Sequence, residues 1–216
     1  MKEDWLERFK TIIIEGPIGV GKTSLTNKIA NKYSLTSLLE AADENPFLKN
    51  FYLDSKKFAL PTQLFFLFQR LEQIQKYSQR DLFAENIISD FMIQKDPIFA
   101  SLTLNDDELS LYQKIYRSQI SQSPLPDLVI YLQASPEQLF QRVKKRGNPV
   151  EMNISIEYLQ RLCTSYNKFF YQYTLSPLLV VNTASFNPID NDKDFDSFVN
   201  QLSTLRGKTN FFNSTK

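Results

Sequence analysis

Short apolar runs alternate with longer amphipathic stretches along most of the chain. The runs have the length of buried strands and lie at 11–14, 37–39, 83–90, 128–132 and 177–181. Between them, apolar residues recur at helical spacing, chiefly over 25–33, 57–77, 106–121, 135–147 and 156–173. The unbroken apolar run at 128–132 is typical of a central parallel strand that is covered on both faces. The alternation therefore predicts an α/β fold with a five-stranded parallel sheet and helices on both faces.

No feature of the composition divides the chain into separate parts. Neither an internal repeat nor a linker interrupts the alternation, so we expect residues 1–205 to form a single domain. The stretch 182–196 has the composition of a loop and precedes a short helix that runs to Leu205. Residues 206–216 are polar and contain a glycine, so we expect a flexible tail there.

The first apolar run leads directly into a glycine-rich sequence and then into a helical stretch. This order of strand, glycine-rich turn and helix is the context of a phosphate-binding loop, in which backbone N–H groups surround an anion at the N-terminus of the helix. The lysine of such a loop reaches the β- and γ-phosphates, and the hydroxyl that follows it binds Mg²⁺. The predicted triphosphate-binding residues are Gly16, Pro17, Ile18, Gly19, Val20, Gly21, Lys22, Thr23 and Ser24.

Two carboxylates follow predicted strands and are candidates for chemistry. Glu40 comes after the second strand, where open α/β sheets bind ligands. A general base and a solvated acidic turn both fit this position. Asp90 ends the third strand, which beside a phosphate-binding loop is the position of a carboxylate that orders Mg²⁺. A helix N-cap at Asp90 is compatible with that role.

Polar side chains interrupt two of the predicted helices. Gln63 and Arg70 are seven residues apart, two turns along one face of an aromatic helix. They either bind a ligand, since a buried carboxamide offers a donor and an acceptor to a base edge, or point to water. Arg142 and Arg146 are four residues apart, just before Gly147. They either close over phosphoryl oxygens as a lid or form a solvated basic face.

Charge, cysteine and histidine content narrow the class of protein. The net charge of +1 gives no electrostatic reason to expect nucleic acid or membrane partners, and no apolar run approaches the roughly 18 residues of a membrane span. The first ten residues lack the apolar core of a signal peptide, and Cys163 has no partner, so we expect a cytoplasmic protein. The absence of histidine leaves acid–base chemistry to carboxylates, lysine or tyrosine.

With these residues assembled, the chain resembles the deoxynucleoside kinases, particularly the bacterial deoxyadenosine and deoxyguanosine kinase branch, over about residues 11–205. The resemblance is carried by IEGPIGVGKTSL, ENPFLKNFY, PTQLFFLFQR, PDLVIYLQAS, RVKKRG with Glu151 after it, and EYLQRL…YNKFF. It implies a P-loop kinase fold with a short lid. It also implies transfer of the γ-phosphate of ATP, with Mg²⁺, to the 5′-hydroxyl of a deoxynucleoside, for which we expect a purine.

The resemblance also implies roles for single residues. Glu40 takes the proton of the 5′-hydroxyl, while Lys22, Asp90, Arg142 and Arg146 act on the phosphates and the metal. Gln63 pairs with the base beside Arg70, and Tyr52 and Glu151 hold the sugar 3′-hydroxyl. In addition to these implied roles, we expect Phe91 to stack on the base together with Phe47 and Phe66.

The chain departs from the family pattern at two motifs. Many relatives carry Glu/Asp-Arg-Ser after the third strand, where this chain has Ser89-Asp90-Phe91. Either Lys95 or a lid residue then supplies the missing charge near the 5′-oxygen, or catalysis is weaker. The lid motif Arg-Gly-Arg is reduced to Arg146-Gly147-Asn148.

Two other functions remain compatible with the sequence. One is a nucleoside-monophosphate kinase of the same fold, although the acidic stretch 40–44 favours a neutral acceptor. The other is a non-catalytic nucleotide-binding regulator. The apolar helix faces and the resemblance also lead us to expect a homodimer.

Overall fold

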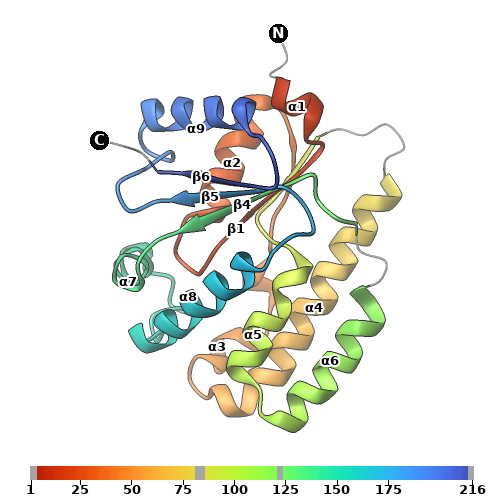
Figure 1. Cartoon of the computed structure of the whole chain (residues 1–216). Helices are drawn as coiled ribbons and strands as arrows, with labels where there is room; N and C mark the ends of the chain where they lie inside the picture. The colour runs from red at the N-terminus through yellow and green to blue at the C-terminus, as the bar shows by residue number, and fades with distance from the viewer. Residues whose placement is uncertain (1–3, 81–85, 121–123, 214–216) are drawn as a thin grey trace.

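The computed structural model describes residues 4–80, 86–120 and 124–213 of the 216-residue chain. Its centre is a six-stranded sheet in the order β2-β3-β1-β4-β5-β6, in which every neighbouring pair is parallel (Figure 1). The strands are β1 (Thr11–Glu15), β2 (Thr36–Leu38), β3 (Ile87–Ser89), β4 (Leu128–Gln133), β5 (Leu178–Asn182) and β6 (Thr209–Phe212). The α/β class and the parallel sheet predicted from the sequence are therefore confirmed.

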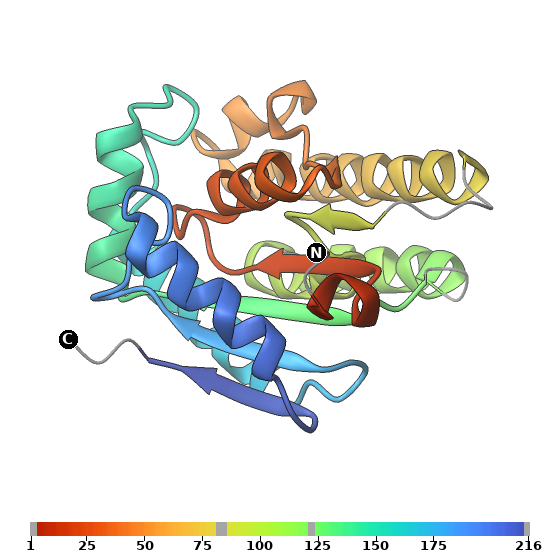
Figure 2. The same cartoon turned by 90° about the horizontal axis from the view of Figure 1, so that it is seen from above.

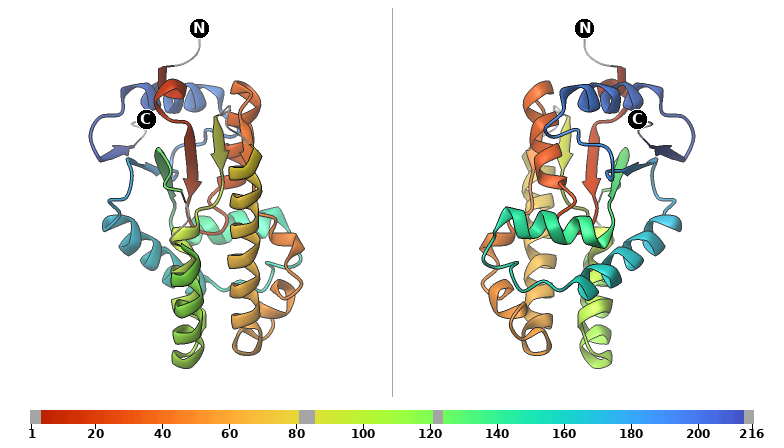
Figure 3. Two further views of the ribbon diagram at one scale, coloured as in Figure 1. Left: turned by 90° about the vertical axis from the view of Figure 1, so that its right-hand side faces the viewer. Right: turned by 90° about the vertical axis from the view of Figure 1, so that its left-hand side faces the viewer.

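Helices flank both sides of the sheet. They are α1 (Asp4–Arg8), α2 (Lys22–Tyr33), α3 (Leu48–Phe51), α4 (Ser55–Arg80), α5 (Asp96–Thr103), α6 (Asp106–Ile120), α7 (Pro136–Arg146), α8 (Ile156–Tyr171) and α9 (Asp192–Thr204), with short 3₁₀ turns η1 (Ala42–Glu44) and η2 (Ile93–Lys95). Figure 1 shows α1, α2 and α9 above the sheet and α5 and α8 below it. Figures 2 and 3 show α4 and α6 side by side, extending away from the sheet.

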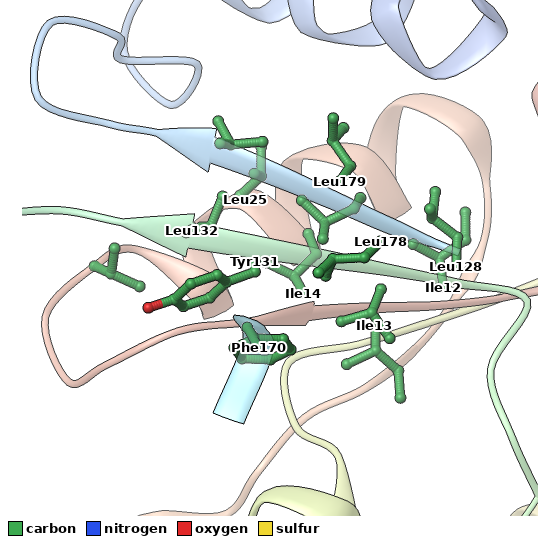
Figure 4. Close-up of a cluster of buried hydrophobic side chains, with 14 of the residues drawn as sticks. Ile12, Ile13, Ile14, Leu25, Leu128, Tyr131, Leu132, Phe170, Leu178 and Leu179 are labelled. Carbon is green, nitrogen blue, oxygen red and sulfur yellow. The ribbon is translucent and has the colours of Figure 1, made fainter. Parts of the chain in front are cut away.

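The core lies where β1 runs between β3 and β4. Ile12 and Ile14 are completely buried and pack among apolar side chains of β4 and β5 (Figure 4). Tyr131 of β4 stacks on Phe170 of α8 with ring centroids 4.1 Å apart, which attaches α8 to the lower face of the sheet. Burial of these large apolar surfaces is the main favourable contribution to folding, so the carboxyl ends of β1 and β4 are held rigidly.

The prediction of five strands was wrong. The sixth strand, β6, lies in the segment predicted to be a tail, where Val180 of β5 pairs with Phe211. Its polar start and short length hide it in the sequence, because it is stabilised by backbone pairing with β5 rather than by an apolar run. Two predicted boundaries, residues 83–85 of the third strand and Ser121 of the helix 106–121, lie outside the described residues.

None of the helices within the described ranges combines the length and the apolarity that a membrane crossing requires.

The long helix α4 contains Pro61, which removes one backbone donor near its start.

The two phenylalanines of β6 allow a test of the sixth strand. Phe212 packs edge-to-face against the buried Phe186 at 4.9 Å, whereas Phe211 is 70% exposed. We expect Phe212→Ala to lower the free energy of unfolding by about 2 kcal/mol and Phe211→Ala to change it by less than about 0.5 kcal/mol. Urea denaturation of both variants measures this, and equal small effects would mean that residues 209–212 form a tail.

Candidate functional site

The glycine-rich loop links the end of β1 to the start of α2. A Cβ atom at Gly16 would lie 2.5 Å from the carbonyl oxygen of Leu132, and one at Gly19 would lie 2.8 Å from Val143 of α7. Both glycines also have a positive φ, so only glycine allows this close approach of the loop to β4 and α7. The Lys22 ammonium lies over the loop and donates to the carbonyl of Gly16 at 2.9 Å. Burial, together with the charge of Lys95, lowers the pKa of Lys22.

The start of α2 and the ends of two strands bring Thr23, Glu40 and Asp90 together beside this loop. The Thr23 hydroxyl donates to one oxygen of the Asp90 carboxylate, and the backbone N–H of Glu40 donates to the other at 2.7 Å. These residues come from α2 and from the ends of β2 and β3, which reach the same edge of a parallel sheet. The Thr23 and Asp90 oxygens are of the kind that Mg²⁺ prefers, and phosphate oxygens and water commonly complete such a site.

Arg70 of α4 lies between two carboxylates. It forms ion pairs with Glu40 and with Asp96, and its Nε donates to Glu40 at 2.7 Å. Burial alone would raise the pKa of Glu40, but the charges of Arg70, Lys95 and Lys22 lower it to about 2. The carboxyl of Asp96 is more deeply buried, and burial raises its pKa to about 6 in spite of Arg70. Of the two carboxyls that flank Arg70, Glu40 is therefore the one that is fully ionised at neutral pH.

A second buried ion pair joins β1 to η2. The Lys95 ammonium lies 2.6 Å from the carboxylate of Glu15, and both side chains are almost completely buried. The other Glu15 oxygen accepts from the Gly16 N–H at 2.8 Å and from the Tyr166 hydroxyl at 3.2 Å. Sequence reasoning missed Glu15, although a charged residue that ends an apolar strand next to a glycine-rich loop was a usable signal.

A cavity of about 90 Å³, called the acceptor cavity below, opens next to Glu40 and Arg70. It is lined by the five residues that we expect to bind the acceptor through side chains other than Phe91, namely Glu40, Tyr52, Gln63, Arg70 and Glu151. Ile18, predicted as part of the triphosphate-binding loop, also lines this cavity. Several other lining residues were not predicted as site residues, namely Thr62, Phe99 and Tyr158, together with Ala42, Leu48 and Phe51. Of the three predicted stacking residues, only Phe66 lines this cavity.

Phe91 does not contribute to the acceptor cavity. It lines a separate cavity of about 230 Å³ with residues of β1 and β3, where its side chain is buried. Successive side chains of an extended segment point to opposite faces. Asp90 contacts Thr23 beside the glycine-rich loop, whereas Phe91 is buried at the other cavity, away from a ligand of the acceptor cavity.

The two predicted lid arginines are held in different places. The Arg142 guanidinium donates to the carbonyl of Thr183 at 2.9 Å and lines a cavity of about 650 Å³, called the donor cavity below. That cavity lies between the glycine-rich loop and the loop 183–191. Arg146 forms an ion pair with Glu151, which lines the acceptor cavity. Helix α7 thus carries one arginine next to each cavity.

Comparisons with known proteins reveal relatives that match almost the whole chain. The profile of the family described as deoxynucleoside kinase matches residues 12–205. A deoxyguanosine kinase of Bacillus subtilis (strain 168) is 34% identical over 199 residues, which are 90% of this chain and 96% of that protein. The deoxyadenosine/deoxycytidine kinase of the same organism is 25% identical over 215 residues, 95% and 97% of the two chains.

Solved structures show the same similarity in three dimensions. The structure of a deoxyadenosine kinase from M. mycoides, with the products dCMP and dCDP bound, superposes with a TM-score of 0.78 at 28% identity. The comparison covers 90% of this chain and all of that one. The same enzyme with bound dATP also gives a TM-score of 0.78.

The pKa of Glu40 predicts a pH dependence of stability. Because its folded pKa of about 2 lies below the usual 4.5, the carboxylate stabilises the fold above pH 4.5, and this stabilisation is lost as the pH falls towards 2. Relative to Glu40→Gln, wild type should lose about 2 kcal/mol of unfolding free energy between about pH 5 and pH 3.

Urea denaturation across this range, with Glu72→Gln as a control in the exposed ion pair with Lys76, provides the measurement. A constant difference between wild type and Glu40→Gln would contradict the pairing of Glu40 with Arg70.

Proposed function

Because the chain belongs to the deoxynucleoside kinase family, we propose that it transfers the γ-phosphate of ATP to the 5′-hydroxyl of a purine deoxynucleoside. Kinase activity on deoxynucleosides follows from the family match over residues 12–205 and from the relatives described above. Purine preference is the finer part of the proposal. It rests on the name of the deoxyguanosine kinase, because the second relative is named for both a purine and a pyrimidine deoxynucleoside. The acceptor cavity carries the rest of the proposal, because it places an ionised carboxylate and a buried carboxamide beside a phosphate-binding loop.

On the donor side, the residues 16–24 would surround the triphosphate with backbone N–H groups. Lys22 would exchange the carbonyls of Gly16 and Pro17 for phosphate oxygens, which are stronger partners for its charge. Thr23 and Asp90 would hold Mg²⁺, whose chemistry here is to offset the negative charge of the phosphates. The donor cavity would receive the nucleoside part of ATP, between the glycine-rich loop and loop 183–191.

On the acceptor side, Glu40 would accept the proton of the 5′-hydroxyl. The 5′-oxygen then bonds to the γ-phosphorus as the bond from that phosphorus to the β–γ bridging oxygen breaks, and ADP leaves. With a pKa of about 2, Glu40 is ionised and able to accept at neutral pH, but it is a weak base. Most of the rate enhancement must therefore come from positioning and from charge stabilisation, as is usual in phosphoryl transfer.

The remaining residues of the acceptor cavity divide between sugar and base. Tyr52 and Glu151 would bind the 3′-hydroxyl, and the ion pair of Glu151 with Arg146 links this contact to α7. Gln63 would pair with the edge of the base. Phe66 and Phe99 line the cavity and would pack against its faces, the role that the sequence had assigned to Phe91.

Lys95 is the residue that we propose as the replacement for the arginine of the Glu/Asp-Arg-Ser motif. Its charge acts on both Glu40 and Lys22, so it lies near the reacting groups. Arg142 and Arg146 would add positive charge from α7 when the phosphates are bound.

The alternative of a monophosphate acceptor fits the acceptor cavity poorly. Glu40 and Glu151 bring two carboxylates to it, and Arg70 is already paired with Glu40 and Asp96. The phosphate of a monophosphate acceptor would find no unpaired cation among the residues that line the acceptor cavity.

We also propose that the protein is a cytoplasmic homodimer. On α4 and α6, Phe68 is 52% exposed and Leu111 is 49% exposed, on the pair of helices that extends away from the sheet (Figure 3). A second copy of the chain would cover these side chains, and Cys163 requires no oxidising compartment.

The function is tested with a panel of the four deoxynucleosides and their monophosphates in a coupled ADP-release assay. We expect turnover of purine deoxynucleosides. Lys22→Ala should lower kcat by about 1,000-fold or more, because the negative charge on the transferring phosphate loses the ammonium group that stabilises it. Lys32→Ala is the matched control on the same helix, since Lys32 lies at the surface, where it pairs with Asp196 and lies over the rings of Tyr33 and Phe195. An active Lys22→Ala variant, or turnover of monophosphates alone, would contradict the proposal.

The role of Lys95 is tested by separating stability from rate. Lys95→Met leaves Glu15 charged and buried, so we expect a loss of about 3 kcal/mol in unfolding free energy together with a lower kcat. Adding Glu15→Gln should restore stability, because the uncompensated charge is removed, but not kcat. If the double variant regains the wild-type kcat, Lys95 serves only to neutralise Glu15.

A further inference from the structure

The acceptor cavity contains a buried hydroxyl group without a hydrogen-bond partner. Thr62 is 1% exposed and lines this cavity next to Gln63, and its Oγ1 atom makes no hydrogen bond. Within the described part of the chain, five buried side-chain atoms share this property, and the others belong to Trp5, Thr26, Gln69 and Gln73. None of these four residues lines the acceptor cavity, the donor cavity or the cavity of about 230 Å³ that contains Phe91. Thr62 is thus the one that faces a ligand site.

The Thr62 residue is held in place by a hydrogen bond to its backbone carbonyl, not by a bond to its hydroxyl. The Asn45 side-chain amide donates to the carbonyl of Thr62 at 3.2 Å, and the Asn45 oxygen accepts from the N–H of Phe47 at 3.0 Å. Threonines inside helices often return their hydroxyl to the carbonyl four residues earlier, but Thr62 makes no such bond. A buried hydroxyl without a partner destabilises a fold, so its presence at a cavity wall points to a partner that arrives with a ligand.

The position of Thr62 along α4 indicates which part of a ligand it meets. Thr62, Phe66 and Arg70 are spaced by four residues and form one stripe of the helix that faces the cavity. Arg70 pairs with Glu40 at one end of this stripe, and Thr62 lies at the other end, roughly 12 Å away along the helix axis. If the 5′-hydroxyl lies at Glu40, the heterocycle extends past Phe66 towards Thr62 and Gln63.

We propose that the Thr62 hydroxyl, together with the Gln63 carboxamide, binds the hydrogen-bonding edge of the acceptor's heterocycle. The inference rests on the proposed function and adds a specificity-determining residue to it. A hydroxyl can both donate and accept a hydrogen bond. Thr62 therefore adds a second contact that the polar edge of adenine or of guanine can satisfy. A heterocycle without a polar atom at that point would leave the hydroxyl buried and unpaired, and would bind more weakly.

Two substitutions separate the hydroxyl from the volume of the side chain. Thr62→Val keeps the shape and removes the hydroxyl, whereas Thr62→Ser keeps the hydroxyl and removes a methyl group. Without ligand, Thr62→Val should have an unchanged or higher melting temperature, because a partnerless polar group is removed. Its kcat/KM for the preferred deoxynucleoside should fall about 10-fold, through KM, while the KM for ATP stays constant. Thr62→Ser should retain most of the wild-type value.

Thr26→Val is the matched control. Thr26 is also completely buried and its hydroxyl has no hydrogen-bond partner, but it lies on α2 and lines none of the three cavities. The KM of Thr26→Val for the deoxynucleoside should therefore not change.

Titration calorimetry with deoxyadenosine and deoxyguanosine measures binding without turnover. An unchanged affinity of Thr62→Val, or equal losses in the valine and serine variants, overturns the inference. If the wild-type protein binds deoxynucleosides but transfers no phosphate to them, and Thr62→Val binds them more weakly, the inference is retained and the proposed function is rejected.

Discussion

Buried charge at the carboxyl end of the sheet is the constraint on which the rest of the site depends. Glu15, Glu40 and Asp96 are held in the interior against Lys95 and Arg70, and the removal of one partner leaves the other uncompensated in a medium that solvates charge poorly. These ion pairs connect β1, α4, η2 and α5 at one place. The glycine-rich loop and the acceptor cavity therefore take their relative positions from this network as well as from the apolar core.

The same network assigns different states to similar groups. Glu40 keeps its charge because three cations act on it, while Asp96, with deeper burial, has a pKa of about 6. Arg70 is occupied on both sides, which leaves the acceptor cavity suited to an uncharged ligand. Specificity then falls to the neutral polar groups at the far end of the cavity, and the charged end serves the reaction.

Much of this arrangement could be predicted from the sequence, for identifiable reasons. Parallel strands end at a common edge, so the residues that follow them, including Thr23, Glu40 and Asp90, were expected together, and the structure places them in contact. What the sequence did not predict depends on tertiary contacts: β6 is stabilised by pairing with β5, and Phe91 is buried at a cavity that Glu40 does not line. Glu15 and Thr62 were missed because their meaning lies in burial, which the local pattern does not report.

A crystal structure with a purine deoxynucleoside and a non-hydrolysable ATP analogue tests the central claim most directly. The account predicts the 5′-oxygen about 3 Å from the Glu40 carboxylate, a hydrogen-bond distance, with the triphosphate along residues 16–23. It also predicts the edge of the base between Gln63 and Thr62. A deoxynucleoside bound elsewhere, with the acceptor cavity filled by the protein's own side chains, would contradict it.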